Sequence, residues 1–262
     1  MKYPEIENNF LEKILIVIPA RYASTRLPGK PLIKINNKSI IQYVYENVSS
    51  FNLFKTIVIA TDDYRILEES KSFGAHAELT PSDCATGTDR IAYIVNQPRY
   101  KDYEIIINIQ GDEPIIDMQS VVNAVKLLLQ NKADVATLSI KLKNITDIQN
   151  PNIVKVVFDK FQNALYFSRC AIPFTRDGNI EQTDYYKHIG VYIYKRQVLL
   201  NFTMLPQTKL ELAEKLEQLR LLENGYKISV ALTDIDTIGV DVKEDIQKLE
   251  QYLNNKSNAE KN

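Results

Sequence analysis

The sequence predicts an α/β protein with a doubly wound, mostly parallel sheet and one antiparallel, strand-rich insertion. Apolar runs rich in β-branched residues alternate with amphipathic stretches along most of the chain, as expected when each strand is followed by a crossover helix. Several of these runs are apolar throughout, which is typical of strands covered on both faces. The length of 262 residues, with 45% hydrophobic and 25% charged side chains, suits one large domain or two at most.

The individual strands and helices follow from this periodicity. Asp63 is a helix start signal, and Asn224-Gly225 is a stop signal. The expected strands are residues 14–18, 56–60, 105–109, 135–140 and 228–232. The expected helices are residues 39–50, 63–73, 89–95, 118–130 and 212–224.

Residues 152–194 break the alternation, because IVKVVFD, ALYFSR and YKHIGVYIY are typical of strands in succession, joined by polar segments such as residues 176–179. This pattern fits an antiparallel extension of the same sheet or an inserted arm used for dimer contact, and we expect a combination of the two. Residues 1–13 are expected to form an N-terminal extension, residues 14–253 a single α/β domain, and residues 254–262 a polar tail.

Composition argues against several classes of protein. Lysine plus arginine (32) nearly cancels aspartate plus glutamate (33), so no overall field favours nucleic acid or an anionic membrane. The N-terminus carries acidic residues, and its apolar run is too short for a signal peptide or a spanning helix, so we expect a cytoplasmic protein. Cys84 and Cys170 lack CxxC spacing and are expected to be reduced.

The segment IPARYASTRLPGKPL (residues 18–32) predicts a polyphosphate site. It sets Arg21, Arg26 and Lys30 among turn-forming residues directly after an apolar strand, and the carboxyl end of such a strand is where α/β sheets bind phosphates. Ser24 stands where a Walker A loop needs glycine, so kinases and GTPases are not favoured. Three cations within ten residues suit a triphosphate and a departing pyrophosphate, although a solvated basic loop is the alternative.

Two carboxylates are candidate Mg²⁺ ligands. Asp112 follows the strand that ends in NIQGDEP (residues 108–114), and a carboxylate at this edge of a sheet is suited to Mg²⁺; a purely structural turn is the alternative. Asp241 and Asp245 open the last helix, so Asp241 is either an N-cap or a second Mg²⁺ ligand.

Seven segments occur together and in order. These are IPARYASTRLPGKPL, ATDD (60–63), GTDRIA (87–92), NIQGDEP, ALYFSR, YKHIGVY and LEQLR (216–220). From about residue 14 to about residue 250, the chain thereby resembles the 3-deoxy-manno-octulosonate (KDO) cytidylyltransferases. The resemblance implies a fold of the nucleotide-diphospho-sugar transferase type, a homodimer, and Mg²⁺-dependent coupling of CTP to KDO, with release of pyrophosphate, for lipopolysaccharide biosynthesis.

The resemblance also implies roles for particular residues. The residues matching those that hold the CTP phosphates are Arg21, Ser24, Arg26 and Lys30, and those beside the nucleotide are Thr88, Asp89 and Arg90. Asp112 and Asp241 match the Mg²⁺ ligands, and with Arg21 and Lys30 they make up the expected catalytic set. The residues facing the sugar acid would be Gln110, Arg169, His188, Tyr192 and Glu211. Each of these five also has a structural alternative, such as a surface ion pair, a sheet-face aromatic or a helix-end charge.

The expected reaction is attack of the anomeric hydroxyl of the sugar acid on the α-phosphorus of CTP. No protein general base is evident, so the metal is expected to activate the hydroxyl. One departure concerns the sugar, because the family commonly has a histidine where this chain has Leu212; the 8-amino analogue of KDO is therefore an alternative substrate. A CMP-sialate synthetase, a metal-dependent glycosyltransferase and a non-catalytic nucleotide-binding regulator are further alternatives.

Overall fold

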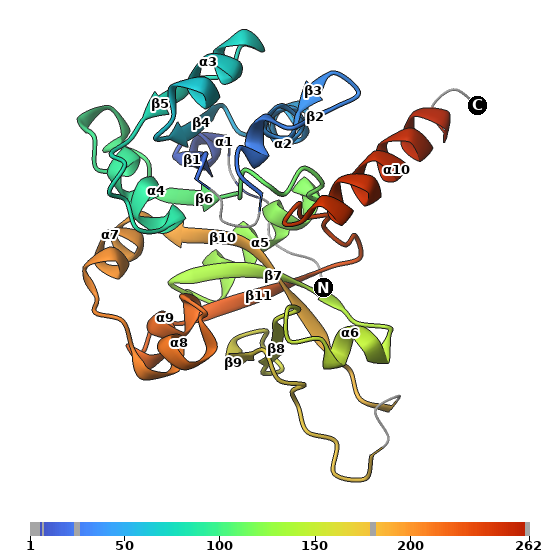
Figure 1. Ribbon diagram of the computed structural model, residues 1–262. Coiled ribbons are helices and arrows are strands. Elements are labelled where there is room, and N and C mark those ends of the chain that lie inside the picture. Colours follow the sequence, from blue (N-terminus) through green and yellow to red (C-terminus); the bar gives the residue numbers. More distant parts are fainter. Residues whose placement is uncertain (1–5, 7, 24–26, 179–181, 260–262) are drawn as a thin grey trace. The chain divides into compact units, whose positions relative to one another are not determined.

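The computed structural model describes residues 6, 8–23, 27–178 and 182–259 (Figure 1). The chain divides into two compact units. The Lys30 unit comprises Leu11–Tyr103, Asn108–Ile116 and Asp236–Asn262, and the His188 unit comprises Met1–Phe10, Glu104–Ile107 and Asp117–Ile235.

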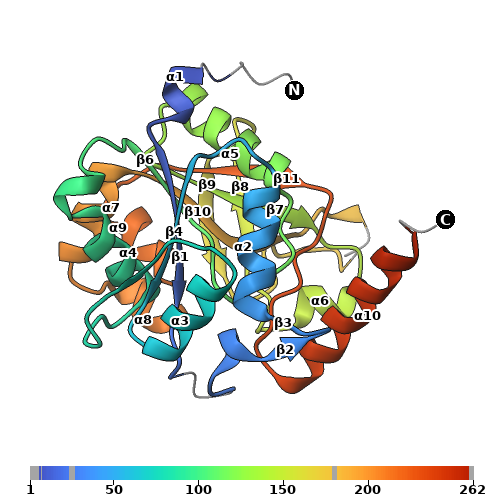
Figure 2. The ribbon, with the colours of Figure 1, turned by 90° about the horizontal axis from the view of Figure 1, so that it is seen from above.

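The Lys30 unit is built on three parallel strands in the order β1 (Ile14–Ala20), β4 (Thr56–Thr61) and β5 (Ala77–Leu79). All seven residues of β1 are buried, which explains why its sequence is apolar throughout. Helix α3 (Tyr64–Ser72) packs on β4 and β5, and α4 (Gly87–Val95) packs on β1 and β4. Figure 2 shows α3 in front of these strands and α2 (Ile40–Ser50) to one side of them.

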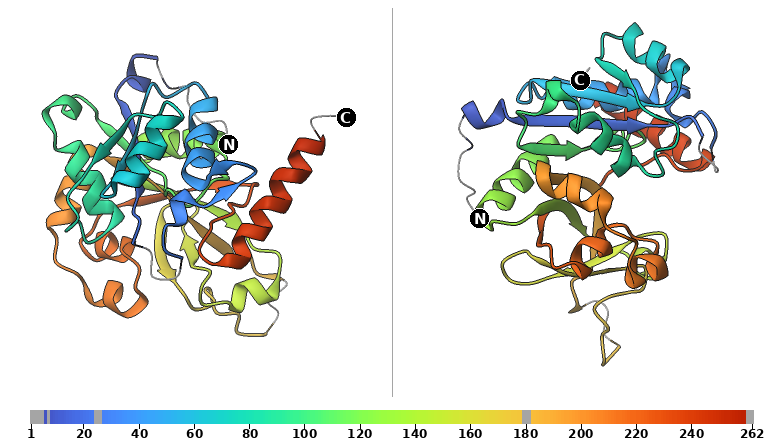
Figure 3. Two further views of the ribbon diagram at one scale, coloured as in Figure 1. Left: turned by 45° about the horizontal axis from the view of Figure 1, so that its top comes forward. Right: turned by 90° about the vertical axis from the view of Figure 1, so that its left-hand side faces the viewer.

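Residues from several elements and loops of the Lys30 unit form a buried apolar cluster outside its strands β1, β4 and β5. Leu27, Ile40, Val240 and Leu249 belong to one buried apolar cluster, and Leu249 lies on the long C-terminal helix, red in Figure 3. The remaining elements here are η1 (Lys30–Leu32), β2 (Lys34–Ile35), β3 (Lys38–Ser39), η2 (Pro98–Tyr100) and α10 (Lys243–Ala259). Helix α1 (Asn8–Leu11) precedes β1.

The His188 unit contains strands in the order β11 (Ile228–Thr233), β7 (Val135–Lys141), β10 (Tyr186–Lys195) and β6 (Ile105–Asn108). Strand β11 is parallel to β7, whereas β10 is antiparallel to it. Helix α5 (Met118–Gln130) packs on β7 and β11. The remaining elements are α6 (Ile145–Gln149), β8 (Lys155–Phe158), β9 (Ala164–Ser168), α7 (Arg196–Met204), α8 (Lys209–Glu214) and α9 (Gln218–Glu223).

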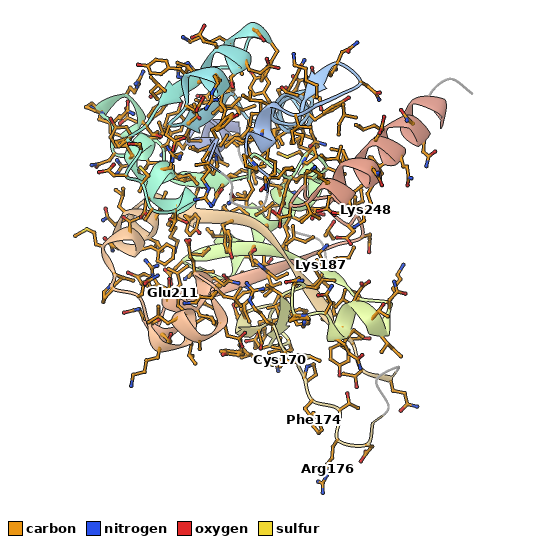
Figure 4. All side chains as sticks on the ribbon, in the orientation of Figure 1. Cys170, Phe174, Arg176, Lys187, Glu211 and Lys248 are labelled. Carbon is orange, nitrogen blue, oxygen red and sulfur yellow. The ribbon has the colours of Figure 1, made fainter. Side chains whose placement is uncertain are left out.

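The predicted fold class is confirmed, including the antiparallel, strand-rich insertion. Strand β8 pairs with both β9 and β10, so the insertion extends the sheet, as one of the two interpretations expected. Between β9 and β10 the chain forms an arm that carries Phe174 and Arg176 (Figure 4). The Phe174 side chain is 87% exposed; its use in dimer contact stays a prediction.

The helix expected over residues 212–224 is instead two short helices, α8 and α9. Lys215 adopts the left-handed conformation (φ 55°) and ends α8, so one apolar periodicity is shared by two helices. In the part of the chain that the structure describes, every helix is too short or too polar to cross a membrane.

Candidate active site

Lys30 is the centre of the candidate site in the Lys30 unit. It begins η1 directly after Gly29, which has φ 69°. The residue is 7% exposed, and its Nζ donates to Asp112 Oδ2 and, at 3.0 Å, to Asp241 Oδ1. Three predicted catalytic residues from distant parts of the sequence therefore meet, with a buried ammonium between two carboxylates.

Main-chain hydrogen bonds hold Asp112 in this place. The Gly111 N–H donates to Pro19 O at 3.2 Å, and a Cβ at position 111 would lie only 2.8 Å from that oxygen, so only glycine fits. The Val240 N–H donates to Asp112 O at 2.9 Å. The segment after β6 is thus fixed to the end of β1 and to the residue before Asp241.

The structure shows what the carboxylates of Asp241 and Asp245 contact, and a Mg²⁺-ligand role for Asp241 stays a prediction. Asp245 Oδ2 accepts from the backbone N–H groups of Asp241 (3.0 Å) and Val242 (3.1 Å). Asp245 therefore satisfies the orphan donors at the start of α10, while the Asp241 carboxylate accepts from Lys30. Burial alone would raise the pKa of Asp245, but these hydrogen bonds and Lys248 outweigh burial and lower it.

The carboxylate pair fits a Mg²⁺ ion that is shared with substrate. The side chains of Asp112 and Asp241 are 33% and 51% exposed, so both can be reached from solvent. Mg²⁺ commonly uses one or two carboxylates and completes its octahedron with water and substrate phosphates. Among the residues the structure describes, no group of three or more His, Cys, Asp or Glu side chains is placed to hold a metal, so phosphate oxygens would be needed.

Of the other predicted phosphate contacts, Arg21 is exposed just beyond β1, while Ser24 and Arg26 lie outside the described residues. The structure adds a residue that the sequence interpretation missed. The Tyr22 ring contacts the position of Gly29, where a Cβ would lie 3.0 Å from it, and the Arg65 guanidinium covers the ring at 3.4 Å. Tyr22 therefore packs against Gly29, the residue before Lys30.

Asp63 holds Arg65 in this position through two side-chain hydrogen bonds of 2.9 and 2.7 Å. Those bonds lower the pKa of Asp63. Asp63 lies in the ATDD segment, which was the available sequence signal for this contact.

The predicted nucleotide-side residues Thr88, Asp89 and Arg90 lie in the first turn of α4. Asp89 forms a capping box with Thr86. Arg90 is 3% exposed and donates to Asp62 at 2.8 Å and to Thr80. Asp89 and Arg90 thus fix the start of α4 against the ends of neighbouring strands, and direct contact with the nucleotide stays a prediction.

Gln110, a predicted sugar contact, lies close to the same helix start. Its Nε2 donates to Asn108 Oδ1 at 3.1 Å, and its Oε1 would be 3.6 Å from a Cβ at Gly87.

In the His188 unit, His188 and Tyr192 belong to a row of rings on β10 and its neighbours. The His188 and Tyr192 ring centroids are 5.4 Å apart, and Phe167 meets His188 edge-on at 5.0 Å. The row continues through Tyr194 to Phe202, which the Arg220 guanidinium covers at 4.7 Å.

His188 is half-buried, and its Nε2 lies 2.9 Å from Thr137 Oγ1. Burial lowers the pKa of His188 from 6.5 to about 3, because an imidazolium would lose its hydration. The imidazole is therefore neutral at physiological pH.

Glu211 is 3% exposed and lies on α8 (Figure 4). Arg220 donates to its two oxygens at 2.8 and 2.5 Å, and the Thr208 N–H donates at 3.2 Å. Burial alone would raise the pKa of Glu211, but the Arg220 and Thr208 hydrogen bonds outweigh it and lower the pKa. Arg220, which the sequence interpretation placed only within LEQLR, ties α9 to the start of α8.

Arg169 is held through main-chain oxygens. Its Nε donates to Glu214 O at 2.7 Å and its Nη1 to Pro151 O at 3.1 Å. Nearby, the fully buried Lys155 donates to the carbonyls of Asn150, Ile153 and Arg169 at 2.9, 2.6 and 2.6 Å. Burial lowers the pKa of Lys155. Lys155 lies within an apolar strand sequence, so the sequence analysis did not single it out. Its hydrogen bond to Arg169 O fixes the main chain there.

Comparison with known proteins bears on this arrangement. The family model described as cytidylyltransferase matches residues 15–228. The chain belongs to the cytidylyltransferase family. It is 46% identical over 243 residues to a 3-deoxy-manno-octulosonate cytidylyltransferase of Solibacter usitatus, covering 92% of this chain and 94% of that protein. It is also 46% identical over 244 residues to an 8-amino-3,8-dideoxy-manno-octulosonate cytidylyltransferase of Shewanella sp. (strain ANA-3), covering 92% and 98%.

Solved structures of other proteins are similar to this one. A CMP:2-keto-3-deoxy-manno-octonic acid synthetase complexed with CTP has a TM-score of 0.86 and 39% identity, with coverage of 93% of this chain and 99% of that one. A 4-diphosphocytidyl-2C-methyl-D-erythritol synthase from Anaerococcus prevotii, 13% identical with a TM-score of 0.63, shares the fold. The predicted resemblance is confirmed.

Proposed function

We propose that this protein couples CTP to the anomeric hydroxyl of 3-deoxy-manno-octulosonate, giving the CMP-sugar and pyrophosphate for lipopolysaccharide synthesis. The observation that carries the proposal is the meeting of Lys30 with Asp112 and Asp241. A cation between two reachable carboxylates, at the end of a buried strand, suits a metal-bound triphosphate. The similarity to KDO cytidylyltransferases supports the choice of substrates.

In this reaction the cations of the Lys30 unit neutralise phosphate charge. Lys30 and Arg21 would bind the phosphates that leave as pyrophosphate, and Tyr22 with Arg65 would keep Lys30 in register. Asp112 and Asp241 would hold Mg²⁺, which supplies positive charge to the phosphates and lowers the pKa of the attacking hydroxyl. Ser24, Arg26, Thr88, Asp89 and Arg90 are proposed to line the nucleotide side.

The sugar acid would bind to side chains that the protein already holds in place. Arg169 has a guanidinium suited to the sugar carboxylate, and Gln110, His188 and Tyr192 supply uncharged polar groups. Glu211, whose carboxylate is paired with Arg220, would act through the position of α8. We also propose a cytoplasmic homodimer in which the arm between β9 and β10 takes part in subunit contact.

The 8-amino analogue of KDO is the second candidate substrate. Leu212, which stands where the family commonly has a histidine, is 45% exposed beside Glu211. Enzymes named for KDO and for its 8-amino analogue are equally similar to this chain, at 46% identity.

The test is pyrophosphate release by the purified protein with CTP and Mg²⁺, offered KDO, its 8-amino analogue and sialic acid in parallel. Release with KDO is expected, and release with the 8-amino analogue alone would transfer the proposal to that sugar. Release with sialic acid alone would indicate a CMP-sialate synthetase. CTP binding without release in any mixture would contradict the proposal and favour a glycosyltransferase or a nucleotide-binding regulator.

A further inference from the structure

A bulge in β10 brings two carbonyl groups to the hydroxyl of Thr137. His188 pairs with Ser139, and Ile189 with Leu138, but the next pair is Tyr192 with Thr137. Here β7 advances by one residue while β10 advances by three, which is a β-bulge. Thr137 is fully buried, and its Oγ1 lies 3.1 Å from Ile189 O and 2.7 Å from Val191 O.

Hydrogen-bond accounting at this hydroxyl assigns the proton on His188. A threonine hydroxyl has one proton, and carbonyl oxygens can only accept. The proton of Thr137 is therefore directed to Ile189 O and Val191 O, so Thr137 Oγ1 must accept from its third neighbour, His188 Nε2, at 2.9 Å. In the neutral ring this leaves Nδ1 without a proton, as an acceptor.

In the part of the chain that the structure describes, no charged side chain pairs with His188 to favour an imidazolium. Thr137 lies on β7, the Phe167 ring on β9, and the Tyr192 ring on β10. Within the residues that the structure describes, no hydrogen bond to His188 Nδ1 is formed by protein groups. His188 as a residue is half-buried, and Nδ1 is the ring nitrogen left to accept from a donor outside the protein.

We propose that Thr137 is a positioning residue that fixes His188 as the Nε2–H tautomer, so that Nδ1 accepts a hydrogen bond from a hydroxyl of the sugar acid. This inference rests on the proposed function. It assigns His188 to a donor group of the sugar and excludes it as the carboxylate partner, because a nitrogen lone pair repels a carboxylate. The carboxylate must then bind elsewhere, and the Arg169 guanidinium is the suitable group.

The tautomer is measured directly by long-range ¹H–¹⁵N NMR on the uniformly ¹⁵N-labelled protein. The chain has only two histidines, so His76 serves as the reference imidazole. We expect His188 to keep a protonated Nε2 and a bare Nδ1 between about pH 5 and 8. A proton on Nδ1, or an imidazolium at about pH 6, would overturn the inference without bearing on the enzyme reaction.

Variants of Thr137 test its positioning role. Thr137→Val keeps the shape but removes the acceptor, so both tautomers of His188 are expected, with KM for the sugar acid raised about tenfold and KM for CTP unchanged. Thr137→Ser keeps the hydroxyl and should retain both the tautomer and KM. Ser139→Ala is the matched control, because Ser139 lies opposite His188 and its buried hydroxyl has no hydrogen-bond partner among the described residues.

Equal KM values for the sugar acid in Thr137→Val and wild type would overturn the positioning role. Loss of the tautomer in Thr137→Ser would do the same, and this variant remains informative if the valine variant does not fold. Absence of pyrophosphate release from the wild type with all three sugar acids would instead contradict the proposed function, while the NMR result would still decide the tautomer.

Discussion

In the Lys30 unit, Lys30 meets two carboxylates that solvent can reach, whereas in the His188 unit His188 is neutral and Glu211 is paired inside the protein. Asp112 and Asp241 are 33% and 51% exposed around Lys30. In contrast, His188 is neutral and Glu211 is committed to Arg220. The first arrangement is suited to binding a highly charged ligand, and the second to fixing the direction of hydrogen bonds.

The largest expected effect comes from breaking the buried Glu211–Arg220 ion pair of the His188 unit. Glu211→Gln keeps the size of the side chain but leaves the buried Arg220 guanidinium without its carboxylate. We expect the free energy of unfolding to fall by roughly 3–5 kcal/mol, measured by urea denaturation. Glu250→Gln, at an exposed position of α10, is the control and should change little.

The same variant tests the proposed role of Glu211 at the sugar site. A higher KM for the sugar acid at unchanged stability would mean that Glu211 contacts the sugar directly, as the sequence alone suggested. Loss of stability with an unchanged KM for the sugar acid would mean that its role is to hold α8.

The next largest effect concerns the carboxylates around Lys30. Asp112→Asn should reduce the turnover of CTP on the order of 10²–10³-fold, because one carboxylate of the proposed Mg²⁺ pair is lost. Circular dichroism should show an intact fold, since the Val240 hydrogen bond uses the main chain of Asp112. Asp102→Asn, on an exposed turn, is the matched control. Near-normal turnover of Asp112→Asn in pyrophosphate release would refute the metal-ligand role.

The neutrality of His188 gives a third, smaller effect. The pKa of His188 is about 3 in the folded state against 6.5 ordinarily, so the unfolded chain binds the proton first as pH falls. Folding stability is therefore complete above about pH 6.5 and declines below it, by about 2 kcal/mol between pH 7 and 5. In urea titrations at these two pH values, His188→Asn should reduce the decline, and an equal decline in both proteins would show that another group is responsible.

These contrasts also explain which parts of the site the sequence could predict. Lys30 and Asp112 follow buried strands, and the carboxyl ends of such strands gather at one edge of a sheet, so their meeting was predictable. The contact of Asp241 with Lys30 was not, because Asp241 and Asp245 are both plausible caps and only their hydrogen bonds distinguish them.

The His188 unit was less accessible to prediction. A two-residue bulge leaves no signature in the alternation of YKHIGVYIY, so Thr137 could not be connected to His188. The left-handed Lys215 is equally hidden, because non-glycine residues rarely adopt that conformation. Long-range side-chain pairing, such as Arg65 on Tyr22, depends on the tertiary structure and not on local pattern.

The smallest expected effect tests whether the charged side also depends on preorganisation. Arg65→Met removes the guanidinium that covers the Tyr22 ring, a cation–π contact at an exposed site. Because Tyr22 packs on Gly29 next to Lys30, KM for CTP should rise a few-fold while KM for the sugar acid stays the same. Lys71→Met, on the same helix and 54% exposed, controls for loss of positive charge. If both variants raise KM for CTP equally, α3 acts only through its positive charge. If Arg65→Met alone raises it, the packing of Tyr22 on Gly29 holds Lys30 in place. The Lys30 unit would then also rely on a side chain that is fixed before substrate binds.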